Sequence, residues 1–144
     1  WEMIIVGDGP YLPNLKNEIN EFSLPRVKLK GFQKPEPYYE KSKIFIIPSA
    51  YEGFPNTLLE AQSFGCVPFA FDSYDALRWI VKDGFNASLS PAYDYKHLAS
   101  NILEVATSPK KLSEMSSLSN QNAERFTIDT VGPIWLNFFK KIVN

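Results

Sequence analysis

The sequence predicts an α/β protein in which helices cover both faces of a parallel sheet and a helical tail follows at the C-terminal end. Two observations support this fold class. Over the first 90 residues, short apolar segments of strand length alternate with segments of helical periodicity, which is the order typical of parallel βαβ units. Ile44–Ile47 and Val67–Phe71 are apolar at every position, as expected for strands that are buried on both faces.

The elements before residue 43 are defined by simple patterns. An apolar run is cut short at Gly7–Pro10 by two glycines and a proline, which predicts a strand and a turn. Apolar residues then recur at three- and four-residue steps, as on one face of a helix, and further on they alternate with lysines, as in a strand. The expected elements are strands at Glu2–Val6 and Arg26–Gly31, a helix at Leu12–Phe22 and a short helix at Pro37–Ser42.

From residue 43 onward, further strands and helices precede the tail. Gly65 and Gly84 are expected to end two of the helices, because glycine is favoured just past a helix end. The tail is too short for a core of its own, so we expect it to pack on the sheet or on a partner. The expected elements are strands at Lys43–Pro48, Val67–Phe71 and Ala87–Leu89, helices at Thr57–Phe64 and Ala76–Val81, and tail helices from Asp94, at Lys110–Phe126 and at Val131–Ile142.

Composition narrows the function classes. The chain has 144 residues, which suits one domain with a sizeable core. Its net charge is -1 and it has no block of basic residues, which argues against nucleic acid as the main partner. The longest apolar runs are a few residues, far short of the roughly 20 that span a membrane. Cys66 is the only cysteine, which excludes an internal disulfide, predicts no cysteine-based metal site and fits a reducing, cytoplasmic setting.

The segment Pro48–Gly65 has the chemistry of a ligand site. Glu52 and Glu60 flank a loop that follows an expected strand, and ligands of doubly wound sheets bind beyond the carboxyl ends of strands. The helix that begins near Asn56 or Thr57 offers unpaired N–H groups and a partial positive charge, which suit a phosphate. Carboxylates accept hydrogen bonds from sugar hydroxyls. A nucleotide-sugar, with ribose, diphosphate and hexose, would fit this combination.

Each of these residues also has a simpler interpretation. Thr57-Leu58-Leu59-Glu60 is a capping box, in which Glu60 reaches back to the Thr57 N–H. Glu52 in a loop is by default a solvated charge. The combination, rather than either glutamate alone, indicates the ligand site.

The same segment resembles a known family. Glu52–Ala61, which reads EGFPNTLLEA, looks like the E-x7-E signature of the family 4 (group 1) retaining glycosyltransferases. The likeness covers about residues 3 to 90. Four flanking blocks also resemble that family in the same order, namely Ile4–Pro10, Val27–Phe32, Tyr39–Ser49 and Gly65–Pro68.

The resemblance implies a parent enzyme with the two-domain GT-B fold. Residues 1–144 look like its C-terminal, Rossmann-like half, a single donor-binding domain. We expect the chain to be a fragment that lacks the first strand of this half, the family's upstream basic loop and the N-terminal acceptor domain.

The resemblance also implies roles for individual residues. Glu52 would be the catalytic residue that contacts hydroxyls of the transferred sugar, and Glu60 would accept hydrogen bonds from the ribose. The donor sugar and diphosphate would be held around Gly53, Phe54, Asn56, Thr57 and Leu58. Gly7 and Gly9 would line the near side of the cleft, and the backbone at Phe32 and Gln33 would flank the base.

By the same analogy, the parent enzyme transfers a sugar from a nucleotide-diphosphate sugar to a glycan or lipid-linked acceptor, with retention, in cell-surface polysaccharide biosynthesis. It would need no metal and no cofactor besides the donor substrate. We expect it to be cytoplasmic, at the inner face of the membrane through peripheral association. The fragment alone is expected to bind donor without transferring sugar.

The sequence departs from the family pattern at some positions, and other functions stay open. Many family members carry Gly-Gly and then glutamate after the strand that ends at Asp72, whereas here Arg78 or Trp79 takes the glutamate position and Ala87 replaces a later glycine. These departures concern the acceptor side. The alternatives are a nucleotide-sugar epimerase with the same fold, a non-catalytic interaction module and, third, a dehydrogenase.

Other candidate residues have structural interpretations. His97 is the sole histidine and is expected to have a surface or packing role. Asp72 and Asp75 could form a catalytic pair, but Asp75 is expected to cap the following helix. Cys66 is expected to be a small buried apolar group. Trp135, Phe138 and Phe139 are expected to pack in the core, with interdomain contact or membrane association as alternatives.

Overall fold

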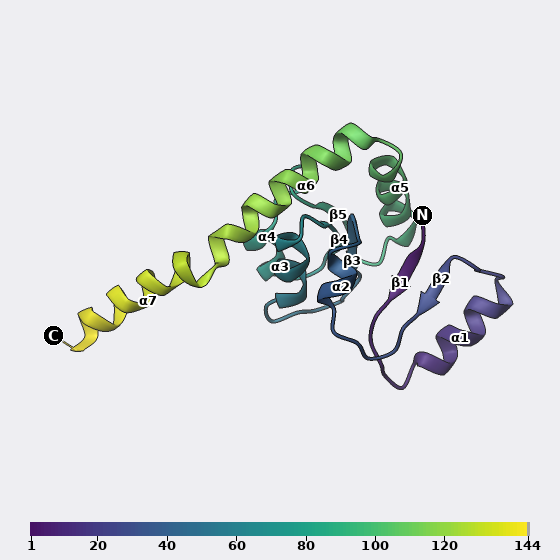
Figure 1. Ribbon diagram of the computed structural model, residues 1–144, viewed down its shortest axis with the longest axis horizontal. Coiled ribbons are helices and arrows are strands. Elements are labelled where there is room, and N and C mark those ends of the chain that lie inside the picture. Colours follow the sequence, from purple (N-terminus) through teal and green to yellow (C-terminus); the bar gives the residue numbers. More distant parts are fainter. Residues whose placement is uncertain (144) are drawn as a thin grey trace. The chain divides into compact units, whose positions relative to one another are not determined.

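The computed structural model describes residues 1–143 (Figure 1). The chain divides into two compact units, Trp1–Tyr38 and the part from Tyr39 onward, and each is described by itself. The elements in chain order are β1 (Met3–Ile5), α1 (Leu12–Glu21), β2 (Val27–Leu29), α2 (Glu36–Tyr39), β3 (Ile44–Ile47), α3 (Asn56–Ser63), β4 (Val67–Asp72), α4 (Asp75–Ile80), β5 (Ser88–Pro91), α5 (Tyr95–Ala106), α6 (Pro109–Ala123), the 3-10 turn η1 (Glu124–Phe126) and α7 (Ile128–Val143).

The first unit is a single βαβ motif. β1 and β2 pair in parallel, with Ile4 opposite Lys28, and α1 connects them. The turns that follow the two strands are joined, because the Gly7 N–H donates to the Gly31 carbonyl over 2.8 Å. Gly31 has φ +67°, a conformation that glycine adopts without steric cost. The turn after β1 is therefore held beside the turn after β2.

The second unit contains a three-stranded parallel sheet in the order β3-β4-β5. Ile46 lies opposite Phe69 and Phe69 opposite Ser88. All three strands run in the same direction, so their carboxyl ends share one edge of the sheet. This edge positions the loop between β3 and α3.

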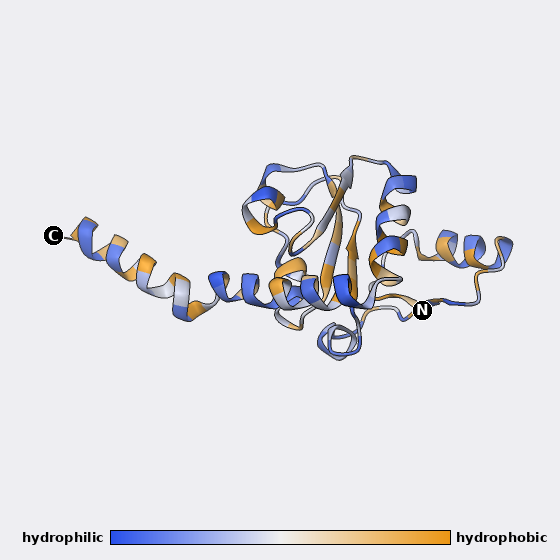
Figure 2. Ribbon diagram, turned by 90° about the horizontal axis from the view of Figure 1, so that it is seen from above, coloured by the Kyte–Doolittle hydropathy of each residue, from blue (hydrophilic) through white to orange (hydrophobic). Residues whose placement is uncertain are grey.

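Helices cover both faces of this sheet, as the sequence predicts. Along β4, the side chains of Val67, Phe69 and Phe71 pack with residues of α5 and α6, whereas Ala70 packs on the opposite face with Leu58 of α3 and with α4. Figure 2 shows the hydrophobic colouring concentrated on these strands. The continuous apolar pattern of β4 follows from this burial on two faces.

The tail behaves differently along its length. α6 packs against α3 and β4, as expected for a tail that returns to the sheet. No residue of α7 is buried, and this helix extends away from the sheet of its unit (Figures 1 and 2). Trp135 stacks on Phe139 with ring centroids 5.6 Å apart, yet both rings remain about half exposed. The expectation that these aromatics pack in the core is therefore wrong, because α7 contacts η1 rather than the sheet.

Among residues 1–143, no helix is both long and apolar enough to cross a membrane.

Candidate functional site

The loop from β3 to α3 is tied to the end of the neighbouring strand. The Ser73 hydroxyl, just past β4, donates to the Ser49 carbonyl over 2.9 Å. The Ser49 hydroxyl in turn donates to Oε1 of Glu52 over 2.8 Å. These two bonds place the partly buried Glu52 carboxylate at the carboxyl edge of the sheet, where ligands of α/β proteins bind.

The N-terminus of α3 lacks a side-chain cap. Pro55 is the N-cap residue, and no side chain of the described part of the chain accepts a hydrogen bond there. The N–H groups of Gly53, Phe54 and Thr57 have no hydrogen-bond partner within residues 1–143. These donors and the helix dipole make this end suited to an anion.

The capping box expected at Thr57 and Glu60 is not formed. The helix begins at Asn56, so Thr57 already lies inside its first turn and cannot cap it. Glu60 does not reach back to the Thr57 N–H; instead Oε2 lies 3.5 Å from the hydroxyl of Tyr39, which is at the outer limit of a hydrogen bond. The Glu60 carboxylate is exposed and keeps acceptor capacity for another partner.

At the end of β4, Asp72 forms a two-bond ion pair with Arg78 and does not form a carboxylate pair with Asp75. Arg78 donates to both oxygens of Asp72, over 3.0 and 2.7 Å. The hydrogen bond from Arg78 holds the pKa of Asp72 below its usual value. Asp75 is the first residue of α4, and Tyr74 precedes it at the N-cap position with no side-chain cap bond. The expectation that Asp75 caps this helix is therefore wrong.

Tyr74 is a site feature that sequence reasoning missed. Its side chain is buried, and its hydroxyl is a buried side-chain polar atom without a hydrogen-bond partner in the part of the chain that the structure describes. Burial, and secondarily the charge of Glu52, raise the pKa of Tyr74 to about 12. A tyrosine directly before a predicted helix gives no sequence signal that its hydroxyl is buried without a hydrogen-bond partner.

The remaining predicted residues belong to the two units as follows. Leu58 is fully buried in the core under the first turn of α3, and its N–H already donates to the Pro55 carbonyl over 3.0 Å. Gly7, Gly9, Phe32 and Gln33 lie in the first unit, and a Cβ added at either glycine would meet nothing within 4 Å. The Phe32 side chain is 84% exposed. The meeting of these residues with the α3 loop stays a prediction.

His97 lies at the surface and Cys66 is buried, as predicted. Nδ1 of His97 lies 3.1 Å from the Ser90 hydroxyl and 3.2 Å from the Asn101 amide nitrogen. Cys66 is fully buried, and this burial raises the pKa of its thiol to about 11 although the charge of Lys43 opposes the shift.

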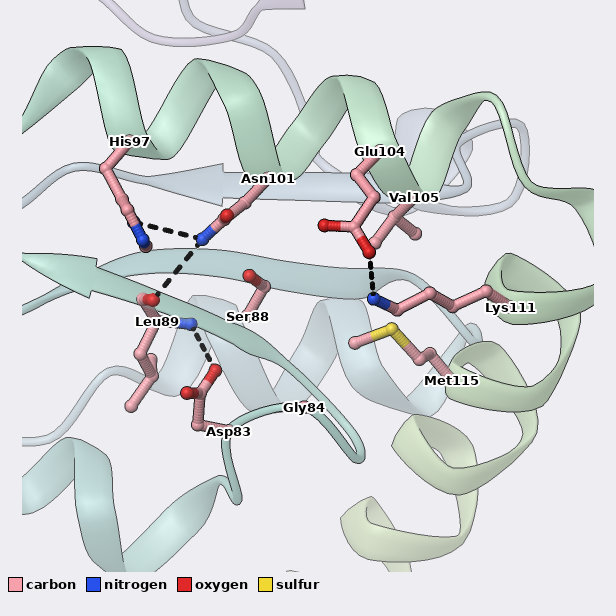
Figure 3. A pocket seen from close by; sticks show the side chains of 10 residues that line it. All are labelled: Asp83, Gly84, Ser88, Leu89, His97, Asn101, Glu104, Val105, Lys111 and Met115. Carbon is pink, nitrogen blue, oxygen red and sulfur yellow. Dashed lines mark hydrogen bonds and ion pairs between the residues drawn. The ribbon is translucent and has the colours of Figure 1, made fainter.

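A pocket of about 220 Å³ lies beside His97, away from the α3 loop in sequence (Figure 3). Asp83, His97 and Asn101 hydrogen-bond within the chain, and Lys111 forms a 2.8 Å ion pair with Glu104. The pocket is lined by Asp83, Gly84, Ser88, Leu89, His97, Asn101, Glu104, Val105, Lys111 and Met115. Across the described residues, no group of three or more His, Cys, Asp and Glu side chains could hold a metal ion, and metal independence stays an expectation.

The second unit is a Rossmann-like α/β arrangement of a parallel sheet between helices, and comparisons with known proteins identify the family of the chain. The sequence profile of the family "Glycosyl transferases group 1" matches residues 1–122. The chain therefore belongs to the group 1 glycosyltransferase family.

Two relatives show the range of this similarity. An exopolysaccharide phosphotransferase of Streptomyces coelicolor is 29% identical over 100% of this chain and 16% of its own length. The UDP-Gal:alpha-D-GlcNAc-diphosphoundecaprenol alpha-1,3-galactosyltransferase of Escherichia coli is 34% identical over 78% of this chain and 30% of its own length. The chain thus spans less than a third of either relative.

A solved structure agrees with the predicted GT-B fold. TarM of S. aureus, crystallised with Fondaparinux, alpha-GlcNAc-glycerol and UDP, matches 96% of this chain and 29% of its own with a TM-score of 0.87 at 26% identity. The prediction of a Rossmann-like half of a GT-B glycosyltransferase is confirmed at the level of fold and family.

Proposed function

We propose that this chain is the donor-binding part of a retaining glycosyltransferase that uses a nucleotide-diphosphate sugar. One observation carries the proposal: Glu52 and Glu60 flank a helix N-terminus where three N–H groups, those of Gly53, Phe54 and Thr57, have no partner among the described residues. The diphosphate would accept hydrogen bonds from the N–H groups of Gly53, Phe54 and Thr57. The carboxylates would accept hydrogen bonds from hydroxyls on either side of it.

The helix end also suits the chemistry of transfer. Breaking the bond between sugar and diphosphate leaves positive charge on an oxocarbenium-like sugar and negative charge on the leaving phosphate. Preorganised N–H groups at α3 would stabilise the leaving group, and Glu52 would orient the sugar. This arrangement requires no metal ion, so we propose a metal-independent enzyme.

The relatives support a choice of donor and pathway class. UDP is present in the TarM structure, and UDP-galactose appears in the name of the Escherichia coli relative. We propose a UDP-sugar as donor and a glycan or lipid-linked acceptor of cell-surface polysaccharide synthesis. The acceptor domain would lie in the same protein, at the cytoplasmic face of the membrane.

The experiment is product analysis with the full-length protein and UDP-sugars. We expect release of UDP without added metal and a product whose anomeric configuration, read by NMR, matches that of the donor. Inversion would contradict the retaining mechanism. A sugar epimer would indicate the epimerase, and transfer of a phosphate-containing group would indicate the reaction named for the Streptomyces relative. An interaction module would bind no nucleotide, and a dehydrogenase would bind NADH instead.

A further inference from the structure

The Tyr74 hydroxyl is a polar group to which the proposed donor site assigns no role. The residue is 7% exposed, and its hydroxyl has no hydrogen-bond partner among residues 1–143. Leaving a buried hydroxyl unpaired is unfavourable, and such groups are uncommon in folded proteins. This hydroxyl is therefore expected to gain a partner in another state of the protein.

The ring of Tyr74 is held in place by the core. It packs in the cluster that contains Ile47 at the end of β3, Leu58 in the first turn of α3, and Leu77 of α4. Well-packed core side chains rarely change rotamer without displacing their neighbours. The partner must therefore come to the hydroxyl.

Glu52 is the acceptor that lies within electrostatic reach. The Glu52 charge acts on Tyr74 and raises its pKa. The loop of Glu52 is held beside Tyr74, because Ser73, the preceding residue, donates to the Ser49 carbonyl over 2.9 Å. A carboxylate can accept about four hydrogen bonds, and among residues 1–143 only the Ser49 hydroxyl donates to the Glu52 carboxylate. An unpaired donor thus lies near an acceptor with free capacity.

We propose that Tyr74 is a positioning residue for Glu52: its hydroxyl donates to the Glu52 carboxylate when a donor sugar is bound beside that carboxylate. The inference rests on the proposed function, because it needs a donor sugar beside Glu52. The bond would fix the carboxylate against the rigid core, so that both of its oxygens are oriented toward the sugar.

The test compares the full-length protein with its Tyr74→Phe variant by calorimetric titration with UDP and with UDP-glucose, UDP-galactose and UDP-N-acetylglucosamine. We expect the variant to bind the preferred UDP-sugar about tenfold more weakly and UDP with unchanged affinity. Its unliganded melting temperature should equal or exceed that of the parent, because an unpaired buried hydroxyl is removed. Tyr95→Phe, which removes an exposed hydroxyl, should change none of these quantities.

A double-mutant cycle with Glu52→Gln separates positioning from packing. Because Tyr74 is proposed to act through Glu52, Tyr74→Phe should cost little further affinity in the Glu52→Gln background. Additive losses would overturn the inference, as would a variant that melts at lower temperature or loses UDP and UDP-sugar equally.

The remaining outcomes separate this inference from the proposed function. If the parent binds UDP-sugars and Tyr74→Phe binds them equally well, the inference alone fails. If the parent binds neither UDP nor any UDP-sugar, the proposed donor site fails, and the inference fails with it.

Discussion

The two ends of helix α3 differ in how completely their backbone groups are bonded. At the C-terminal end, the Gly65 N–H donates to the Gln62 carbonyl and the Cys66 N–H to the Ala61 carbonyl, over 2.8 and 3.0 Å. Side chains of α6 donate to the carbonyls that follow: Ser116 to Gly65 over 2.6 Å and Ser119 to Cys66 over 2.7 Å. At the N-terminal end, no side chain caps the helix in the described part of the chain.

This difference indicates that the C-terminal end of α3 has a structural role and that the N-terminal end is available to a ligand. The C-terminal end uses most of its backbone groups in bonds within the chain, and these bonds join α3 to α6. The end with free amides carries an unfavourable energy that a bound anion would relieve. We expect substitutions at the N-terminal end of α3 to change activity or ligand binding. Substitutions at the C-terminal end should change the free energy of unfolding.

The largest effect is expected at Glu52. Glu52→Gln in the full-length protein should lower kcat with the preferred UDP-sugar on the order of 10²-fold, because the charge beside the transferred sugar is lost. The melting temperature should stay close to that of the parent, since the Ser49 bond can be kept by an amide oxygen. Enzyme assay and thermal unfolding measure the two effects. Glu114→Gln on α6 is the matched control, and full activity of Glu52→Gln would refute the catalytic role.

Gly65→Ala should affect stability instead. Gly65 has φ +76°, and an added Cβ would lie 3.0 Å from the Ser116 hydroxyl oxygen. We expect the free energy of unfolding to fall by roughly 1–2 kcal/mol, measured by urea denaturation. Gly53→Ala is the control at the other end, because its Cβ would meet nothing within 4 Å. A larger loss of stability for Gly53→Ala than for Gly65→Ala would contradict the structural role assigned to the C-terminal end of α3.

Glu60→Gln should weaken nucleotide binding with little change in folding. The expected ribose contact would lose its charge, so the Kd for UDP should rise by about tenfold. The 3.5 Å contact with Tyr39 is long, and its weakening should leave the melting temperature near that of the parent. Calorimetry measures the Kd. An unchanged Kd would mean that Glu60 is only a surface residue of α3.

At neutral pH the smallest effect is expected at Cys66, whose thiol titrates only in the alkaline range. Burial raises the pKa of this thiol to about 11 from a usual 9.0, so the unfolded chain loses the proton first as pH rises. Stability is unaffected below pH about 9 and falls between pH about 9 and 11, by up to about 1.4 kcal/mol per pH unit. Thermal unfolding of the parent and of Cys66→Ala across this range measures the contribution. Parallel pH profiles would show that the thiol does not titrate in this window.

Sequence patterns predicted the parts of the fold that depend on local or two-sided burial. β3 was predictable because it is apolar at every position, and β4 because it is apolar up to Phe71. The E-x7-E spacing assigned the candidate site to the loop from β3 to α3, which stays a prediction. The capping box failed because three residues of sequence cannot show where the chain enters the helix. Pro55 takes the N-cap position and moves Thr57 into the first turn.

The contacts that could not be predicted join residues far apart in sequence. Gln62 is fully buried, and its carbonyl oxygen accepts from Asn122 over 3.0 Å, 60 residues away. The Asn122 amide also donates to the Ile80 carbonyl over 2.8 Å. Periodicity treats such amides as surface residues. The exposure of α7 was missed for the opposite reason, because its apolar face resembles that of a core helix.

The central claim is that the free amides at the N-terminus of α3 bind a diphosphate. Calorimetric titration of the full-length protein with UDP and with uridine tests it most directly, because the two ligands share base and ribose. We predict saturable one-to-one binding of UDP and at least about tenfold weaker binding of uridine, a difference of roughly 1.4 kcal/mol. Equal affinities, or no binding of UDP, would contradict the account.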